Sequence, residues 1–389
     1  MVVTIAQRGT TTNIDNQFGN FNYLINYPVK NRSNSPTLFL SRSAIKKNYD
    51  RLKNALPRVQ IHYAVKPNIH PVILQVVKDA GGSFDICSAG ELVEVLKTGI
   101  SPSNLIHTHP IKSNDEFNYA VSKGIRTFVV DNLAEVEKLR RFPKTKLKIM
   151  IRFRIKEKSN AVVNLQYKFG CSQEEVLPLA EKIKETGHQF AGLCFHLGSQ
   201  CVDSSNYLKA IEVSSQLIKE LKATGFKTNL LDIGGGFPVE YTEPVKPIDE
   251  FCKPIAAALD KYIPQEIKVL SEPGRYISAN AVYLVSTIIG KAKRDDKIWY
   301  YLDDGLYSTF SGMLFDHCRY PIITYKSGES INSVLAGPTC DSFDVIYDGI
   351  MLPEHNIGDR ILFTGVGAYC EVSGSGFNAL KRAVYEVIE

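Results

Sequence analysis

Residues 83–99, SFDICSAGELVEVLKTG, contain the unit from which most of this chain is built. The first part, SFDICSA, is a short apolar segment typical of a buried strand. The second part, GELVEVLKTG, has apolar residues at three- and four-residue spacing, as amphipathic helices do. It ends at a glycine, the residue that often follows a helix C-terminus. This stretch therefore predicts one strand followed by one helix.

The same unit recurs between residues 61 and 280. Eight strand–helix units are the number found in a (β/α)8 TIM barrel. A doubly wound open sheet, in which strands and helices also alternate, is the alternative. The seven further strand candidates are IHYAVK (61–66), NLIHTHP (104–110), IRTFVVD (125–131), KLKIMIRFRI (146–155), FAGLCFHLG (190–198), LLDIGGG (230–236) and KVLSEPG (268–274).

Residues at the ends of the predicted strands favour the barrel. In a barrel the carboxyl ends of all eight strands converge on one mouth, whereas an open sheet brings together only the strands at its switch point. Nearly every predicted strand ends at a polar, chemically capable side chain. These strand-end residues are Lys66, Asp85, His109, Asp131, Arg154, His196, Gly234 and Glu272.

A different pattern follows Arg275, where strand candidates are joined by turns with little helix. They are AVYLVSTIIGKA (281–292), KIWYYLDDG (297–305), PIITYK (321–326), SVLAGPTCDSFDVI (333–346) and DRILFTGVGAY (359–369), and TLFLSR (37–42) has the same character. We therefore expect a mainly β second domain built from both chain ends. Residues 1–42 contribute to it, residues 43–280 form the inserted barrel, and residues 281–389 form the rest.

Composition limits the classes of function. The 389 residues are 44% hydrophobic and carry a net charge of +5, which is mild for a nucleic-acid-binding protein. No apolar run approaches the roughly 18 residues of a membrane span. The first twenty residues lack the pattern of a signal peptide. The eight cysteines include no CxxC pair, so we expect reduced thiols, no metal site and a cytoplasmic location.

The segment LLDIGGGFP (230–238) is the clearest local motif. Consecutive glycines after a buried strand expose backbone N–H groups that suit a phosphate. Barrel phosphate sites often follow the seventh or eighth strand, and this is the seventh. A merely tight strand-to-helix turn is the alternative.

Lys66 ends the first strand of the barrel, where partial burial would make its amine a nucleophile able to form a Schiff base. An amine nucleophile and a phosphate nest together suggest pyridoxal 5′-phosphate (PLP). Glu272 is placed to pair with the pyridine nitrogen, Arg275 to add charge near the phosphate, and His196 to lie on the ring. A strand-end lysine in solvent and a buried structural histidine are the alternatives.

The segment GPTCDSFD (337–344) places Cys340 beside Asp341 in a turn between two strand candidates. Such a pair could ligate a metal, form half of a disulfide, act in catalysis, or do no chemistry. The absence of a paired cysteine motif weakens the first two readings.

Nine motifs resemble the fold-type III PLP-dependent decarboxylases, which include ornithine, arginine and diaminopimelate decarboxylases, and the resemblance is greatest to the ornithine branch. The likeness extends over roughly residues 37–380, in the order typical of that family. The motifs are YAVKPN (63–68), FDICSAGE (84–91), KFG (168–170), FHLGSQCVD (195–203), DIGGGFP (232–238), EPGRY (272–276), FDH (315–317), GPTCDSFD (337–344) and GAY (367–369).

This resemblance implies a PLP-binding barrel similar to that of alanine racemase, in a head-to-tail homodimer with shared sites. Lys66 would carry PLP, His196 would stack on its ring, and Glu272 would pair with its nitrogen. Cys340, supplied by the second subunit, would protonate the former α-carbon, and Lys168 and Asp344 would form an ion pair between subunits. Further residues expected at the cofactor are Asp85, Arg154, Ser199, Gly235, Gly236, Gly274, Arg275 and Tyr369.

The resemblance further implies decarboxylation of a basic L-amino acid, with L-ornithine converted to putrescine and carbon dioxide. Asp316 and Asp341 match the acidic pair expected at the distal amine, with Phe315 beside them. Arg319 could instead receive an acidic group, so lysine, diaminopimelate or a modified diamino acid stay open as substrates. An amino-acid racemase and a non-catalytic binding protein are the remaining alternatives.

Overall fold

The computed structural model describes residue 24 and residues 36–143, 145–155, 161–163, 167–324 and 326–389. Contacts divide the chain into two units. The barrel unit contains residues 45–239 and 245–277, and the β unit contains residues 1–44, 240–244 and 278–389. Most of the predicted N-terminal segment, residues 1–23 and 25–35, lies outside the described residues.

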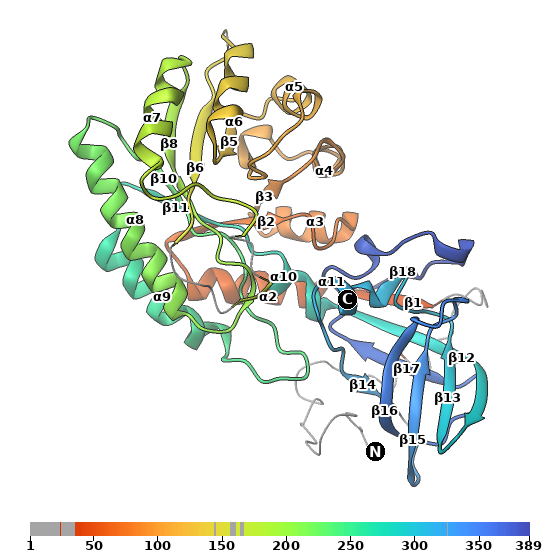
Figure 1. The fold of residues 1–389 in the computed structure, drawn as a ribbon. Helices are drawn as coiled ribbons and strands as arrows, with labels where there is room; N and C mark the ends of the chain where they lie inside the picture. The colour runs from red at the N-terminus through yellow and green to blue at the C-terminus, as the bar shows by residue number, and fades with distance from the viewer. Residues whose placement is uncertain (1–23, 25–35, 144, 156–160, 164–166, 325) are drawn as a thin grey trace. The chain divides into compact units, whose positions relative to one another are not determined.

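The barrel unit contains a closed parallel barrel with the strand order β10-β11-β2-β3-β4-β5-β6-β8 (Figure 1). All eight predicted barrel strands are confirmed, and the open-sheet alternative is wrong. The strands are β2 (Val59–Ala64), β3 (Ser83–Ile86), β4 (Leu105–His107), β5 (Thr127–Val130), β6 (Lys148–Arg152), β8 (Gln189–Cys194), β10 (Leu230–Asp232) and β11 (Lys268–Ser271).

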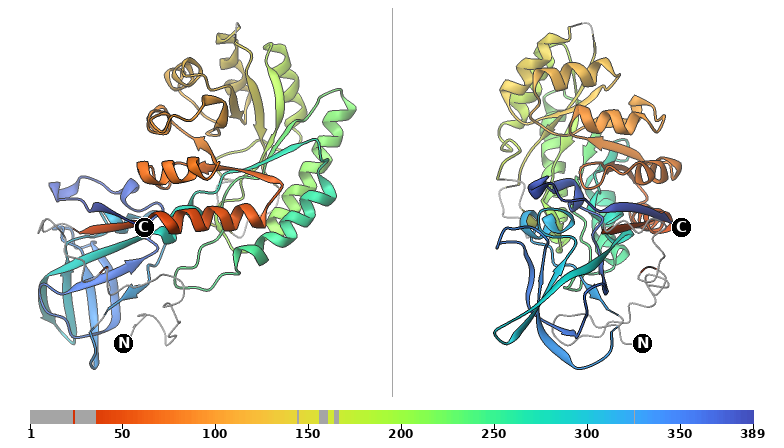
Figure 2. Two further views of the ribbon diagram at one scale, coloured as in Figure 1. Left: turned by 180° about the vertical axis from the view of Figure 1, so that it is seen from behind. Right: turned by 90° about the vertical axis from the view of Figure 1, so that its right-hand side faces the viewer.

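Helices lie outside the barrel strands, as the two views of Figure 2 also show. In the unit quoted first, Ser88 caps α4 by accepting a hydrogen bond from the backbone N–H of Glu91 at 3.2 Å, and Leu92 and Val95 are buried. The helices are α2 (Arg42–Ala55), α3 (Pro71–Asp79), α4 (Ala89–Leu96), α5 (Asn114–Ser122), α6 (Leu133–Lys138), α7 (Val176–Glu185), α8 (Ser205–Ala223), α9 (Ile248–Tyr262) and α10 (Arg275–Ser278).

A short antiparallel pair, β7 (Ala161–Val163) and β9 (Ser199–Cys201), was not predicted. Each strand has only three residues, too few for an alternating pattern to stand out in the sequence. The pair matters because β9 begins at Ser199, one of the predicted cofactor residues.

The β unit is an eight-stranded sheet in which β1 pairs with both β12 and β18. The main path runs β14-β17-β12-β13-β15-β16, so a second, mainly β domain is confirmed. The elements are β1 (Thr37–Ser41), β12 (Val282–Arg294), β13 (Lys297–Leu302), α11 (Gly312–Phe315), β14 (Ile322–Ile323), β15 (Ser330–Ala336), β16 (Val345–Pro353), β17 (Arg360–Thr364) and β18 (Val384–Ile388).

One core cluster of the β unit joins residues far apart in the chain. Leu24 and Phe39 are buried with Tyr283, Ile323 and Leu362. Because Phe39 lies on β1, the N-terminal strand is held by side-chain packing as well as by its ladders to β12 and β18.

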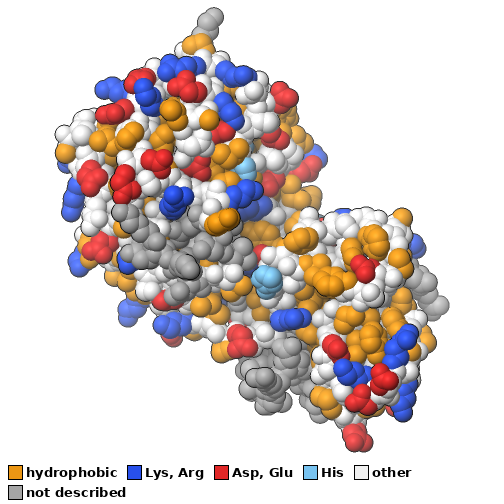
Figure 3. Space-filling view, viewed as in Figure 1, with side chains coloured by type: hydrophobic (Ala, Val, Ile, Leu, Met, Phe, Trp, Pro, Cys, Tyr) orange, Lys and Arg blue, Asp and Glu red, His pale blue; other side chains and the backbone are white. Residues whose placement is uncertain are grey.

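On the face seen in Figure 3, basic and acidic side chains are interspersed, and hydrophobic side chains gather on the β unit. None of the described helices combines the length and apolar character needed to cross a membrane.

Candidate active site

Lys66 follows β2 and lies beside a buried carboxylate at the end of the neighbouring strand β3. Its Nζ is 3.2 Å from Asp85 Oδ2, and Asp85 is fully buried. Asp85 Oδ1 accepts a hydrogen bond from the Thr108 hydroxyl at 2.6 Å. The amine is therefore oriented by an ion pair in a partly buried position, where a lysine nucleophile can be held.

Glu272, which follows β11, belongs to a compact group of buried acids that the sequence analysis recognised only in part. Cys194, Asp232 and Glu272 each place a ligand atom within 4.8 Å of the others, and all three are buried. Burial raises the pKa of Glu272 well above its usual range, and the neighbouring Asp232 raises it further. Burial also raises the pKa of Asp232 to about 6. The group can therefore hold a proton and share it with a basic nitrogen placed beside it.

His196 follows β8 and is 8% exposed. Burial lowers the pKa of its imidazole well below the usual range, and the positive charges of Arg152 and Lys66 act in the same direction. Its Nδ1 accepts a hydrogen bond from the Gly198 backbone N–H at 3.1 Å. Because Nδ1 accepts, the proton of the neutral ring is on Nε2. A neutral ring can pack flat against an aromatic ligand.

The glycines after β10 leave room that any side chain would fill. A Cβ on Gly235 would lie 2.2 Å from the backbone oxygen of Glu272, and one on Gly236 would lie 2.1 Å from that of Gly198. Gly236 also has a φ of +97°, which favours glycine. The backbone here can be approached closely, as an anion nest requires.

Arg275 adds a positive charge in the barrel unit. It is 4% exposed, and its Nε and Nη2 donate to the Ser199 hydroxyl at 3.1 and 2.9 Å. The guanidinium is a planar donor with a fixed positive charge, the kind of group that binds a phosphate.

These residues fit PLP. The close-approach backbone at Gly235 and Gly236 and the buried guanidinium of Arg275 would hold the phosphate. Glu272 would hold the pyridine nitrogen, and Lys66 would hold the aldehyde carbon. Asp232 Oδ2 is buried and has no hydrogen-bond partner among the described residues, as expected of an acid group that awaits a ligand or a shared proton.

Two predicted residues of the barrel unit are exposed. The Arg154 side chain is exposed, and its backbone N–H donates to Cys171 O at 3.0 Å. The buried arginine at the end of β6 is Arg152, which is 8% exposed and lies 5.2 Å from the Phe169 ring. Arg152, whose charge acts on His196, therefore suits the place at the cofactor that was predicted for Arg154 better than Arg154 does. Lys168 is also exposed, with its amine 5.0 Å from the same ring.

Cys340 and Asp341 lie on the loop that joins β15 to β16 in the β unit, residues 337–344, which we call the Cys-Asp loop. Cys340 is exposed, and Asp341 is half-buried. The Tyr307 hydroxyl donates to Asp341 Oδ2, and the Phe343 backbone N–H donates to Oδ1 at 3.0 Å. These hydrogen bonds, that from Tyr307 above all, lower the pKa of Asp341 below its usual value. The carboxylate is thus held in its charged form.

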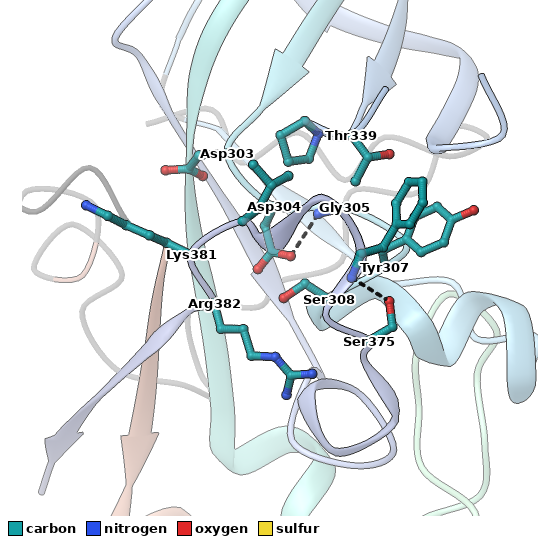
Figure 4. A pocket seen from close by; sticks show the side chains of 12 residues that line it. Asp303, Asp304, Gly305, Tyr307, Ser308, Thr339, Ser375, Lys381 and Arg382 are labelled. Atoms are coloured by element: carbon teal, nitrogen blue, oxygen red, sulfur yellow. Dashed lines mark hydrogen bonds between the residues drawn. The ribbon is translucent and has the colours of Figure 1, made fainter. Parts of the chain in front are cut away.

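The other predicted residues of the β unit lie around α11 and β17. Phe315 is 64% exposed, and Asp316, the next residue, is half-buried. Tyr369 has a φ of +56°, which is uncommon for a tyrosine. A pocket opens beside the Cys-Asp loop (Figure 4), and its lining includes Asp303, Asp304, Tyr307, Ser308, Thr339, Ser375, Phe377, Lys381 and Arg382.

The geometry does not support the ion pair predicted between Asp344 and a lysine of a second subunit. Asp344 is 2% exposed in the single chain. Its carboxylate already accepts hydrogen bonds from the backbone N–H of Leu306 at 2.7 Å, and from the N–H and hydroxyl of Thr339 at 3.2 and 2.7 Å. A carboxylate enclosed in this way holds its own loop together.

Sequence reasoning missed Asp232, Arg152 and Tyr307. Asp232 is the last residue of β10, so it is a strand-end acid like Asp85, but the sequence analysis placed the end of this strand at Gly234. Tyr307 and Asp341 are 34 residues apart, and no local pattern joins them.

Comparisons with known proteins agree with this geometry. Residues 42–279 match the family described as pyridoxal-dependent decarboxylase, pyridoxal binding domain. The lysine/ornithine decarboxylase of Selenomonas ruminantium is 34% identical over 91% of this chain and 90% of its own, and the ornithine decarboxylase of Schizosaccharomyces pombe is 37% identical over 85% and 78%. The crystal structure of lysine/ornithine decarboxylase from Vibrio vulnificus complexed with putrescine aligns with a TM-score of 0.87 and 42% identity, covering 92% of this chain and 95% of its own. The chain thus belongs to the pyridoxal-dependent decarboxylases and is a PLP-dependent carboxy-lyase of basic amino acids.

Proposed function

We propose that this enzyme decarboxylates L-ornithine to putrescine and carbon dioxide. The observation that carries the proposal is Asp341, whose charged form is held by Tyr307 and by the Phe343 N–H. A fixed carboxylate suits the distal ammonium of a diamino acid, and Asp316 offers a second. A substrate without that ammonium would lose this charge-assisted contact, so a diamino acid should be preferred.

L-Lysine is the second candidate substrate. The similar proteins from Selenomonas ruminantium and Vibrio vulnificus are both named lysine/ornithine decarboxylases. Lysine carries the same distal ammonium on one further methylene, and such a difference in length is discriminated by only about 1–3 kcal/mol. Diaminopimelate is less well suited, because its second carboxylate would lie near the charged carboxylate of Asp341 at the distal end.

The barrel residues divide the chemistry among them. PLP supplies an electron sink for the bond that breaks at the α-carbon. Lys66 would hold the cofactor through its amine, and Asp85 orients that amine. Glu272 holds a proton at the pyridine nitrogen, and the neutral His196 ring supports the cofactor face without adding charge.

Cys340 completes the proposed reaction. Its thiol would deliver a proton to the former α-carbon once carbon dioxide has left, so that the product is an amine. A racemase needs a second base opposite the lysine and has no use for a Cys-Asp loop. A non-catalytic binding protein has no need of Lys66, Glu272 and Cys340 together.

We further propose that two chains form a head-to-tail dimer in which each Cys-Asp loop serves the partner subunit's barrel. Cys340 is exposed in the single chain, as a residue that acts on another subunit must be. Exposed hydrophobic side chains of the β unit, such as Phe315 (64%), Phe343 (61%) and Phe377 (41%), are the kind of surface that subunit contacts bury.

The test is carbon dioxide release from L-ornithine, L-lysine, L-arginine and meso-diaminopimelate by the PLP-loaded enzyme. We expect ornithine to have the highest kcat/KM and lysine the next. Lys66→Ala should abolish release, whereas Asp341→Ala should mainly raise KM for both diamino acids. A preference for diaminopimelate would refute the role of Asp341.

A further inference from the structure

Asn378 holds Cys340 at two points. Its Oδ1 accepts a hydrogen bond from the Cys340 backbone N–H at 3.0 Å, and its Nδ2 donates to Cys340 Sγ at 3.4 Å. A backbone N–H can only donate, so the amide oxygen must face it and the amide nitrogen must face the sulfur. One side chain therefore fixes both the main chain and the thiol of the Cys-Asp loop.

The segment that carries Asn378 is itself fixed to the residue that binds Asp341. The Ser375 backbone N–H donates to Tyr307 O at 2.8 Å. The Phe377 ring stacks on the Tyr307 ring with centroids 4.6 Å apart. Asn378 has a φ of +57°, in the left-handed region where asparagine is tolerated better than most residues. The amide is thus presented to the thiol by a packed turn.

We infer that Asn378 is a positioning residue for Cys340, on the basis of the proposed function in which Cys340 delivers a proton. Because the sulfur accepts from Asn378, the S–H bond points away from the amide and is available to the substrate. In the transfer the S–H bond breaks, a C–H bond forms at the former α-carbon, and the electron pair stays on sulfur. The Asn378 N–H stabilises the resulting thiolate until water reprotonates it.

The first test needs no turnover. In cofactor-free protein, the rate at which iodoacetamide alkylates Cys340 is followed by mass spectrometry of its peptide. Cys340 is the exposed cysteine of the described residues, so its signal is easily separated. The thiolate is the form of Cys340 that is alkylated. Asn378→Ala removes the N–H that donates to the sulfur, so it should slow alkylation about five-fold. Asn378→Asp puts a negatively charged acceptor beside the sulfur, so it should slow alkylation more than Asn378→Ala does.

Asn356→Ala is the matched control. Asn356 is an exposed asparagine of the same unit whose hydrogen bond to Asp359 is made by its backbone N–H at 2.7 Å, so deleting its side chain should leave alkylation unchanged. Equal or faster alkylation of Cys340 in Asn378→Ala would overturn the inference.

The second test measures how turnover ends. Asn378→Ala should raise the share of turnovers that give a carbonyl by-product in place of the amine, at least three-fold, with little change in KM. In a Cys340→Ala background, Asn378→Ala should not raise the share of carbonyl by-product any further, because the thiol that Asn378 positions is absent. An equal shift in both backgrounds would contradict the inference. A wild-type protein that releases no carbon dioxide would contradict the proposed function instead. The relative alkylation rates of the wild type, Asn378→Ala and Asn378→Asp would then still test whether Asn378 positions the Cys340 thiol.

Discussion

At the scale of single residues, the barrel unit depends on positions where even one added carbon would not fit. Gly235 is the sharpest case, since a Cβ there would lie 2.2 Å from the backbone oxygen of Glu272. Real Cβ atoms do not approach so closely, so the backbone of either residue would have to move. Such a movement would displace both the proposed phosphate nest and Glu272, the acid proposed to hold the pyridine nitrogen.

We therefore expect Gly235→Ala to weaken PLP binding at least about ten-fold, measured by absorbance titration of cofactor-free protein. Gly90→Ala is the control, because the nearest atom to a Cβ there is 3.7 Å away and α4 would gain a better helix former. Unchanged PLP affinity in Gly235→Ala would show that the loop adapts without cost.

His62 on β2 predicts a pH dependence of stability. Burial lowers the pKa of its imidazole to about 4, whereas in the unfolded chain it is near 6.5. Between pH 6.5 and 4, His62 is therefore protonated in the unfolded chain and neutral in the folded protein. Stability is lost as the pH falls through this range. Between pH 7.5 and 5 this group costs about 2 kcal/mol.

His62→Leu should reduce the loss of unfolding free energy between pH 7.5 and 5 by about 2 kcal/mol, as measured by urea denaturation at both values. The remaining loss belongs to other buried groups such as His107 and His196, whose pKa values burial also lowers. A variant with the same pH dependence as the wild type would contradict this assignment.

At the scale of elements, the loop between β15 and β16 is built around Asp344. Removing its carboxylate would leave the N–H groups of Leu306 and Thr339 unpaired in a buried place. Each such group costs about 1–3 kcal/mol, so Asp344→Ala should lower the free energy of unfolding of the β unit by about 3 kcal/mol. Trp299, the sole tryptophan, lies on β13 and reports on this unit by fluorescence.

Asp348→Ala is the control for that loop. Asp348 is 62% exposed and pairs with Lys297 at 2.7 Å, a surface ion pair worth less than about 1 kcal/mol. Equal destabilisation by both substitutions would mean that the enclosed carboxylate of Asp344 has no special structural role.

Elements also show how far the sequence could be interpreted. The eight barrel strands and the motifs at Lys66, Asp85, His196 and Glu272 were predictable, because period and strand-end chemistry are local properties. The choice between Arg152 and Arg154 was not. Both have the same parity on a strand, so only the point at which β6 ends and the chain turns decides which one is buried. The Asn378–Cys340 contact spans 38 residues, and it depends on a left-handed backbone conformation at Asn378 that no sequence motif predicts.

At the scale of the whole molecule, the proposed dimer gives a quantitative prediction. If the Cys-Asp loop acts on the partner subunit, Lys66→Ala and Cys340→Ala chains complement each other when mixed. Random reassortment at equal amounts places half the chains in mixed dimers, each with one intact site of two, so about one quarter of wild-type activity should return. Activity no greater than that of the two variants alone would show that each chain uses its own loop.

The pairing of β1 with β18 has a consequence for synthesis of the chain. Thr37 is the register partner of Val384, so β1 can pair with β18 only after the whole barrel has been synthesised. The barrel strands are complete once Ser271 has emerged, whereas the sheet of the β unit stays open until β18 has been made. A nascent chain would therefore carry a finished barrel beside an unfinished sheet edge, which is the period when it would be most exposed to aggregation and most in need of a chaperone.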